Sequence, residues 1–261
     1  MAEQLIDGSG EAVIPARYAG SGDRGRDVLD FVAGHPVVLA SHVARLLDLD
    51  AVSAATLLKG VCARGWLRMA GRFRHQPTAL EVTLAGLREL GSELPAPVID
   101  LRRYWRDIAA VALSVGARRG VFGEIDRVYT RREMQAADRQ SSAAGRLDGA
   151  GLSAAIRAKA QDRLFQLGIS SGRAGGGDDG YWPDLVLVLP EGRVAFEIHL
   201  DAPDPPLLDA VLKAYRAKPS VAVVVLLTED PSVGERLHAA AVRHGEDLFR
   251  VKSMRLGRPD R

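Results

Sequence analysis

Asp184, Glu197 and His199 lie at or near strand positions in the segment WPDLVLVLPEGRVAFEIHLDA, which otherwise has the pattern of a strand, a tight turn and a second strand. Taking Glu191 and Gly192 as the turn sets the register of the two strands. Asp184 then lies opposite His199 and shares one face of the hairpin with Glu197, its diagonal neighbour. Two carboxylates about 7–8 Å apart at the backbone can hold one hard cation, Mg²⁺ or Mn²⁺, between them. A shift of one residue would put the two acids on opposite faces.

The chemistry open to such a trio is that of a water molecule bound to a metal ion. Asp184 and Glu197 would be the metal ligands, and a neutral His199 imidazole would accept a proton from the metal-bound water or orient it. One alternative is a scaffold that keeps the acids without activity, because a fold does not confer activity. Another is an ordinary sheet with a hydrated face, which leaves Glu197 among apolar neighbours without a partner.

Three charged residues outside the hairpin are further candidates for such a site. Lys213, on the next predicted helix, can in principle supply a positive charge, and Glu124 or Asp126 a third carboxylate. Their ordinary interpretations are a solvated helix face for Lys213 and exposed acids near a helix end for the other two.

The pattern around the hairpin predicts a mixed sheet with helices on both sides. A long amphipathic helix is expected over residues 100–120, followed by a short strand within 124–134. Residues 135–180 are weakly patterned and are expected to form an insert with one helix over 152–168. After the hairpin come a helix, an unbroken apolar strand (SVAVVVLLT), a helix and a last strand, which complete a domain over residues 98–255.

The first part of the chain has a different pattern. Residues 1–23 are rich in Gly, Ala and Ser and are expected to be a flexible tail. Three short helices follow, in RDVLDFVAG, LASHVARLL and SAATLLKGVCARG, and then two short strands around a basic loop and a closing helix. This order is typical of a winged helix-turn-helix, which we place at residues 24–94, with Pro95 and Pro97 at the boundary to the next domain.

Positive charge is concentrated in residues 51–80, although the whole chain has a net charge of only +2. This basic island contains five Lys and Arg residues and no acid, which favours contact with duplex DNA. The third helix would face the groove and the loop between the strands would contact phosphate or the minor groove. A solvated basic surface used for protein contacts is the alternative. The candidate DNA-binding residues are Ser53, Thr56, Lys59, Arg64, Arg68, Arg72, Arg74 and His75.

A resemblance to a known family follows from these motifs. Pro-Asp at the start of one strand and Glu-x-Lys in the next, on an α-β-β-β-α-β frame, is the pattern of the PD-(D/E)xK nuclease superfamily. Pro183-Asp184 and Glu197-Ile198 match it, and His199 stands in place of the lysine. With the upstream winged helix and the segment VYTRREM, the chain resembles actinobacterial replication-relaxation proteins of plasmids and integrative elements over about residues 25–252.

The resemblance implies a mixed α+β fold, in which a winged helix-turn-helix precedes a restriction-endonuclease-like α/β domain. In that superfamily the two acids hold Mg²⁺, and the lysine activates water and stabilises the transition state. We therefore expect a DNA-binding protein of a mobile genetic element, an accessory of plasmid replication, relaxation or transfer. Because the lysine is missing, its nuclease activity would be weak or absent. The alternatives are an active Mg²⁺- or Mn²⁺-dependent endonuclease and a non-catalytic transcriptional regulator or assembly adaptor.

Composition and missing motifs exclude several other classes. The chain has no GxxxxGK[ST] loop for ATP, and no CxxC or HExxH motif for zinc. Cys62 is the only cysteine and is expected to be a small core residue in a reducing, cytoplasmic protein. No apolar run reaches 18 residues, so we expect neither a secretion signal nor a membrane partner. The expected partners are double-stranded DNA and either a second copy of the chain or other proteins of the mobile element.

Overall fold

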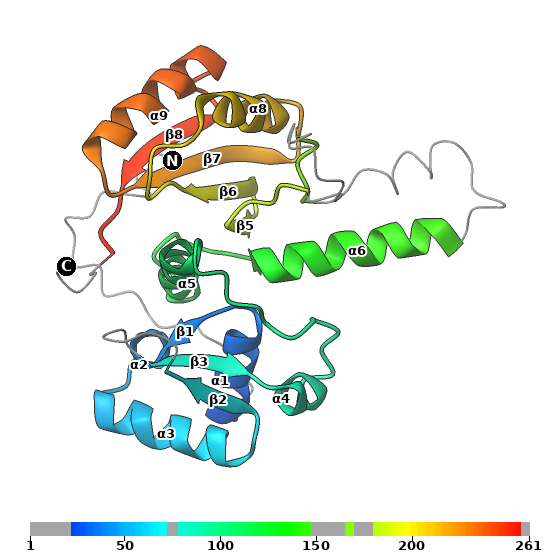
Figure 1. Ribbon diagram of the computed structural model, residues 1–261, viewed down its shortest axis with the longest axis vertical. Helices are drawn as coiled ribbons and strands as arrows, with labels where there is room; N and C mark the ends of the chain where they lie inside the picture. The colour runs from blue at the N-terminus through cyan, green and yellow to red at the C-terminus, as the bar shows by residue number, and fades with distance from the viewer. Residues whose placement is uncertain (1–21, 72–77, 148–164, 170–179, 257–261) are drawn as a thin grey trace. The chain divides into compact units, whose positions relative to one another are not determined.

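The computed structural model describes residues 22–71, 78–147, 165–169 and 180–256, without the side chains of 141–147. The fold is mixed α+β, as expected, with a three-stranded and a five-stranded sheet among these residues (Figure 1). The chain divides into two compact units. Unit 1 comprises Met1–Thr130 with Leu187–Pro190, and unit 2 comprises Arg131–Val186 with Glu191–Arg261.

Unit 1 begins with helices and short strands in the order that the sequence predicts, with one additional two-residue strand. The sheet is antiparallel and has the order β1-β3-β2. The elements are α1 (Arg24–Ala33), β1 (Val38–Leu39), α2 (Ala40–Leu47), α3 (Ala51–Ala63), β2 (Leu67–Ala70), β3 (Ala79–Val82) and α4 (Leu84–Glu89).

Helix α3 shows how the sequence sets these elements. It begins at the Asp50 cap, whose carboxylate accepts hydrogen bonds from the backbone N–H groups of Val52 and Ser53. Its end is followed by Gly65, which adopts a φ of +74°. Leu58 and Val61 are buried in the core that α1, α2 and the sheet share, so α3 is held by one face.

The long helix α5 (Tyr104–Arg118) lies in unit 1, together with β4 (Arg127–Thr130). Its Val111 and Val115 belong to the same core as Leu58 of α3. The sequence assigned this helix to the second domain, because Pro95 and Pro97 precede it, whereas the compact units divide after Thr130. The predicted domain boundaries stay predictions, since compact units and folding domains need not coincide.

Unit 2 contains the hairpin, except for Leu187–Pro190, and the helices and strands that follow it. In the five-stranded sheet the order is β4-β5-β6-β7-β8, and β6–β7 and β7–β8 are parallel pairs. Figure 1 shows α8 and α9 side by side against the β6–β8 part of this sheet. The elements are α6 (Arg131–Leu147), β5 (Leu185–Leu189), β6 (Gly192–Ile198), α8 (Pro205–Arg216), β7 (Val221–Thr228), α9 (Pro231–His244) and β8 (Phe249–Ser253).

Two expectations for this unit are modified. The unbroken apolar run of β7 predicts a strand buried on both faces, but only Val224–Thr228 is buried, and the residues before it are partly or fully exposed. Residues 131–147, mostly within the weakly patterned segment, form α6. The helix expected over 152–168 lies mostly outside the described residues. Across the described part of the chain, no helix is both long and apolar enough to cross a membrane.

Candidate functional site

The hairpin of unit 2 forms, but its predicted register is wrong. The backbone N–H of Asp184 donates to the carbonyl of Phe196 (3.0 Å), so Asp184 lies level with Phe196 and not with His199. Phe196 and Glu197 are neighbours in one strand and point to opposite faces, so Asp184 is not the same-face neighbour of Glu197.

Part of the shift arises at the turn. Strand β5 ends at Leu189 and β6 begins at Gly192, so the turn consists of Pro190 and Glu191 and not of Glu191 and Gly192. This turn alone would pair Asp184 with Glu197, so a further offset of one residue lies between the turn and Asp184. Proline presets the φ of the first turn residue. Gly192 belongs to the strand with a φ of +139°, where a side-chain Cβ would stand 3.0 Å from the Cβ of Ala222.

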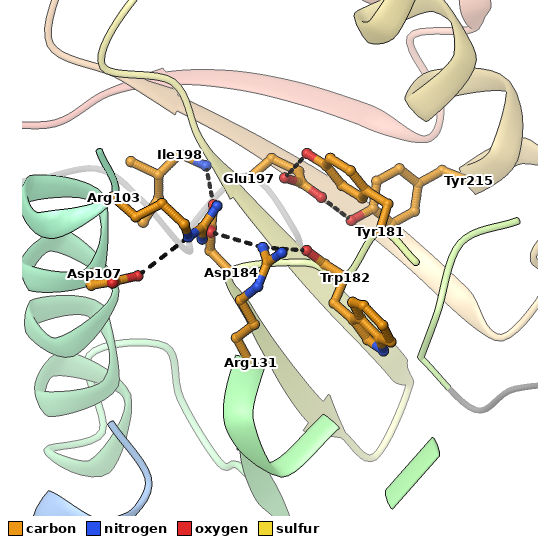
Figure 2. A network of polar contacts seen from close by, with 9 residues as sticks. All are labelled: Arg103, Asp107, Arg131, Tyr181, Trp182, Asp184, Glu197, Ile198 and Tyr215. Carbon is orange, nitrogen blue, oxygen red and sulfur yellow. Dashed lines mark hydrogen bonds and ion pairs between the residues drawn. The ribbon is translucent and has the colours of Figure 1, made fainter. Parts of the chain in front are cut away.

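The Asp184 carboxylate completes the backbone pairing of the hairpin. It is buried, and its Oδ2 accepts a hydrogen bond from the N–H of Ile198 (2.8 Å) (Figure 2). Its Oδ1 lies 4.0 Å from a guanidinium nitrogen of Arg131, which donates to the carbonyl of Trp182 (3.1 Å). The Asp184 carboxylate therefore accepts a hydrogen bond from β6 that a backbone carbonyl would accept in a regular antiparallel pair. The Arg131 guanidinium supplies a positive charge beside it.

The Glu197 carboxylate is held by two tyrosines. The side chain is fully buried, its Oε2 accepts from the Tyr181 hydroxyl (2.7 Å), and its Oε1 accepts from the Tyr215 hydroxyl of α8 (2.5 Å). Burial, and next the charge of Glu197, raise the pKa of Tyr215 well above its usual value, which keeps its hydroxyl protonated as a donor. Figure 2 shows the carboxylates of Glu197 and Asp184 directed toward different partners.

This arrangement does not fit a divalent cation between the two carboxylates. Both oxygens of Glu197 accept hydrogen bonds from protein hydroxyls, and one oxygen of Asp184 accepts a backbone N–H. A shared ion would have to displace these donors, and we derive no step through a metal. Within the described ranges, no group of three or more His, Cys, Asp or Glu side chains is arranged to hold a metal ion.

The other residues proposed for this site have other partners or belong to unit 1. His199 follows β6, is buried, and its N–H donates to the carbonyl of Leu227 (2.7 Å). Lys213 pairs with Asp209 on its own helix (2.7 Å), as its ordinary interpretation predicts. Glu124 and Asp126 are exposed and belong to unit 1, so their role as a third acid stays a hypothesis.

Several residues that build this site were missed from the sequence. Tyr215 lies on the buried face of α8, four residues after Val211. A buried tyrosine hydroxyl needs an acceptor, so the helical spacing of Tyr215 could have indicated a buried polar partner such as Glu197. Tyr181 is positioned by Leu167, whose N–H donates to its carbonyl (2.8 Å). Trp182 is positioned by Asp138 of α6, which accepts a hydrogen bond from its indole N–H (2.8 Å).

The outer side of α3 (light blue in Figure 1) is the candidate nucleic-acid interface in unit 1. Ser53, Thr56 and Lys59 are exposed there, as expected. The Ser53 hydroxyl donates to the Asp50 carboxylate (2.6 Å), and the Thr56 hydroxyl donates to the carbonyl of Val52 (2.9 Å). These hydroxyls have their protons engaged within the helix and can act outward only as acceptors.

The other candidate residues of the basic island, where the structure describes them, have different interaction partners. Arg64 lies 3.7 Å from the Asp23 carboxylate and stacks over the Trp66 ring at 4.8 Å. Cys62 is half-buried, and burial raises the pKa of its thiol, which agrees with a structural role. Three predicted contacts of the loop, Arg72, Arg74 and His75, lie outside the described residues.

Arg68 is bound to an acid that follows the island in the sequence. It faces Glu81 across the β2–β3 pair, and its Nε and Nη2 donate to one Glu81 oxygen at 2.9 and 2.6 Å. Only 1% of the Glu81 side chain is exposed. The guanidinium therefore offsets the charge of a buried carboxylate, which accounts for its position without any DNA.

Arg68→Ala is accordingly expected to destabilise unit 1 by about 1–2 kcal/mol, because the buried Glu81 carboxylate loses a charged donor. Chemical denaturation measures the effect, and the double variant Arg68→Ala/Glu81→Ala should lose less stability than the two single losses summed. Unchanged stability with weakened DNA binding would assign Arg68 to the DNA interface instead.

Comparisons with protein-family models, with curated proteins and with solved structures find no match. A function is therefore inferred from the buried hairpin site and from the exposed side of α3.

Proposed function

We propose that this protein binds duplex DNA through unit 1, with the unit acting as a winged helix-turn-helix whose α3 enters the major groove. The observation that carries the proposal is the element order α1-β1-α2-α3-β2-β3 with an antiparallel β1-β3-β2 sheet. In winged helix-turn-helix proteins the helix before the hairpin is the one that reads the groove, and the hairpin contacts the backbone.

The packing and charge of α3 support this role. One side carries Ala54, Leu58 and Val61 into the core, so the helix is fixed in position while its other side is exposed. The helix has no acidic residue, and Lys59 and Arg64 lie in its second half and at its end. Beyond its cap residue Asp50, the helix therefore presents no negative charge to a polyanion.

The first test measures salt dependence. Binding of the native protein to a fluorescent duplex should weaken as NaCl is raised, and Lys59→Ala should reduce the log–log slope by about 0.9 if the ammonium contacts one phosphate. Lys213→Ala is the matched control, since it removes the same charge from α8 and should leave the slope unchanged. Arg72→Ala with Arg74→Ala should reduce the slope by about 1.8, which corresponds to two phosphate contacts. No salt-dependent affinity for any duplex would reject the proposal.

For unit 2 we propose a nuclease-like scaffold of weak or absent activity, in a protein of the replication-relaxation kind from a mobile element. The support is the engagement of both candidate metal ligands: Glu197 by Tyr181 and Tyr215, and Asp184 by Ile198. The native protein with Mn²⁺ is expected to cleave linear, supercoiled and single-stranded DNA no faster than Glu197→Gln does. Cleavage by the native protein that Glu197→Gln abolishes would favour the alternative, an active Mn²⁺-dependent endonuclease.

A further inference from the structure

One exposed stripe of α3 carries several methyl groups that do not pack in the core. Positions 52, 55, 56, 59 and 63 recur at helical spacing and are all exposed: Val52, Ala55, Thr56, Lys59 and Ala63. Four of the five are small side chains that end in methyl groups. This set is called the outer stripe below.

Val52 is the most conspicuous member of the outer stripe. It lies in the first turn of α3 with 76% of its surface exposed, although a β-branched residue is not a strong helix former. The fold gains little from valine at this position, since the core side of α3 is formed by Ala54, Leu58 and Val61. An apolar side chain here can instead make an intermolecular contact.

The polar groups beside the outer stripe restrict what it can read. The hydroxyl protons of Ser53 and Thr56 are donated to Asp50 and to the Val52 carbonyl, so neither is directed outward. Lys59 is the only charged residue within α3. The stripe and the adjacent Ser53 thus offer methyl groups, two acceptor oxygens and one ammonium. In the major groove, the feature that methyl groups recognise is the 5-methyl group of thymine.

We infer that the outer stripe of α3 reads 5-methylpyrimidines in the major groove, with Val52 as the main contact and Lys59 as a charge contact. The inference rests on the proposed function and specifies its substrate class: duplexes that present thymine at the contacted positions. Gly60, beside the stripe, has nothing within 4 Å of where a Cβ would stand, which leaves room for the helix backbone to approach the groove.

The test compares two pairs of short duplexes, and the members of each pair differ only in this methyl group. The probes are an alternating A·T duplex, the same duplex with uracil for thymine, an alternating G·C duplex, and the same duplex with 5-methylcytosine. Fluorescence anisotropy at one salt concentration gives the affinities. The native protein should prefer each methylated duplex by about four-fold for every methyl group that it buries.

Variants separate the outer stripe from the rest of the protein. Val52→Ser should bind the thymine duplex no better than the uracil duplex. Val98→Ser is the matched control, because Val98 is also exposed in unit 1, at 82%, and it should keep the native preference. Lys59→Ala should weaken binding to all four duplexes while preserving the ratio between methylated and unmethylated forms.

The possible outcomes separate this inference from the proposed function, DNA binding by unit 1, on which it rests. Salt-dependent binding with equal affinity for all four duplexes would overturn the inference and leave DNA binding standing. A preference for thymine without one for 5-methylcytosine would also overturn it, since that result indicates recognition of duplex shape. A methyl preference that survives in Val52→Ser would assign the contact elsewhere and overturn the role of the stripe. If no duplex binds in a salt-dependent way, the proposed function itself fails.

Discussion

Asp138→Ala is expected to destabilise unit 2 by about 4 kcal/mol, because one buried carboxylate accepts three N–H donors and each hydrogen bond to a charged group contributes about 1.5–3 kcal/mol. The donors are the backbone N–H groups of Phe165 (3.2 Å) and Gln166 (2.8 Å) and the indole N–H of Trp182 (2.8 Å). Alanine leaves these donors without their acceptor in a buried site.

Urea denaturation followed by tryptophan fluorescence measures this loss, and the emission should shift to the red as Trp182 becomes hydrated. Asp138→Asn should fall between the native protein and Asp138→Ala, since an amide oxygen can still accept from some of the donors. Arg139→Ala is the matched control on the exposed side of α6 and should have a small effect. A loss below about 1 kcal/mol for Asp138→Ala would show that water replaces the carboxylate and that the network is not structural.

Lowering the pH from about 7.5 to about 5 is expected to cost unit 1 about 2 kcal/mol of stability through His42 alone. Burial first, and the charge of Arg45 second, lower the pKa of His42 from 6.5 to about 4. Its neutral Nδ1 accepts a hydrogen bond from the backbone N–H of Leu39 at the start of α2 (3.2 Å). A protonated ring could not accept this bond.

The direction of the effect follows from the lowered pKa. Between pH 6.5 and about 4 the unfolded chain binds a proton at His42 that the folded chain does not, so stability falls as the pH is lowered through this range. The contribution is fully present above pH 6.5. Thermal or urea unfolding at the two pH values measures it. His42→Gln should remove most of this dependence, whereas His238→Gln, on an exposed position of α9, should keep it. Equal pH dependence in both variants would contradict the assignment.

Much of the fold could be predicted from local pattern. Asp50 marks the start of α3, and the spacing of Ala54, Leu58 and Val61 predicts its buried face. The prediction that residues 51–80 present five free positive charges was incomplete. Glu81 pairs with Arg68 and lies one residue beyond this stretch without acids. A cross-strand pair depends on register, which composition does not show.

The hairpin site could be predicted only in part. Strands β5 and β6 were expected, but their register was not, because Gly192 belongs to the strand and not to the turn, and a further offset of one residue lies between the turn and Asp184. The partners of Glu197 lie 16 and 18 residues away in the sequence, at Tyr181 and Tyr215. Such contacts arise from tertiary packing, which a strand pattern does not specify.

Helix α6 was missed for a related reason. Its described buried side contains Arg132 and Asp138 beside Met134, so the hydrophobic periodicity that marks a helix is interrupted by charged residues. Burial lowers the pKa of Arg132 to about 10, below its usual value. The buried side of α6 therefore includes charged side chains, whereas sequence periodicity identifies a helix by apolar residues at these positions.

Photo-crosslinking can show whether α3 is the surface on which duplex DNA binds. A benzophenone side chain is placed at Ala55 on the outer stripe, or at Val242 on the exposed side of α9 as the control, and the protein is irradiated with a labelled duplex. We expect a crosslink from position 55 that disappears as NaCl is raised, and little or none from position 242. Crosslinking from position 242 but not from position 55, under conditions where the duplex is bound, would contradict DNA binding at α3.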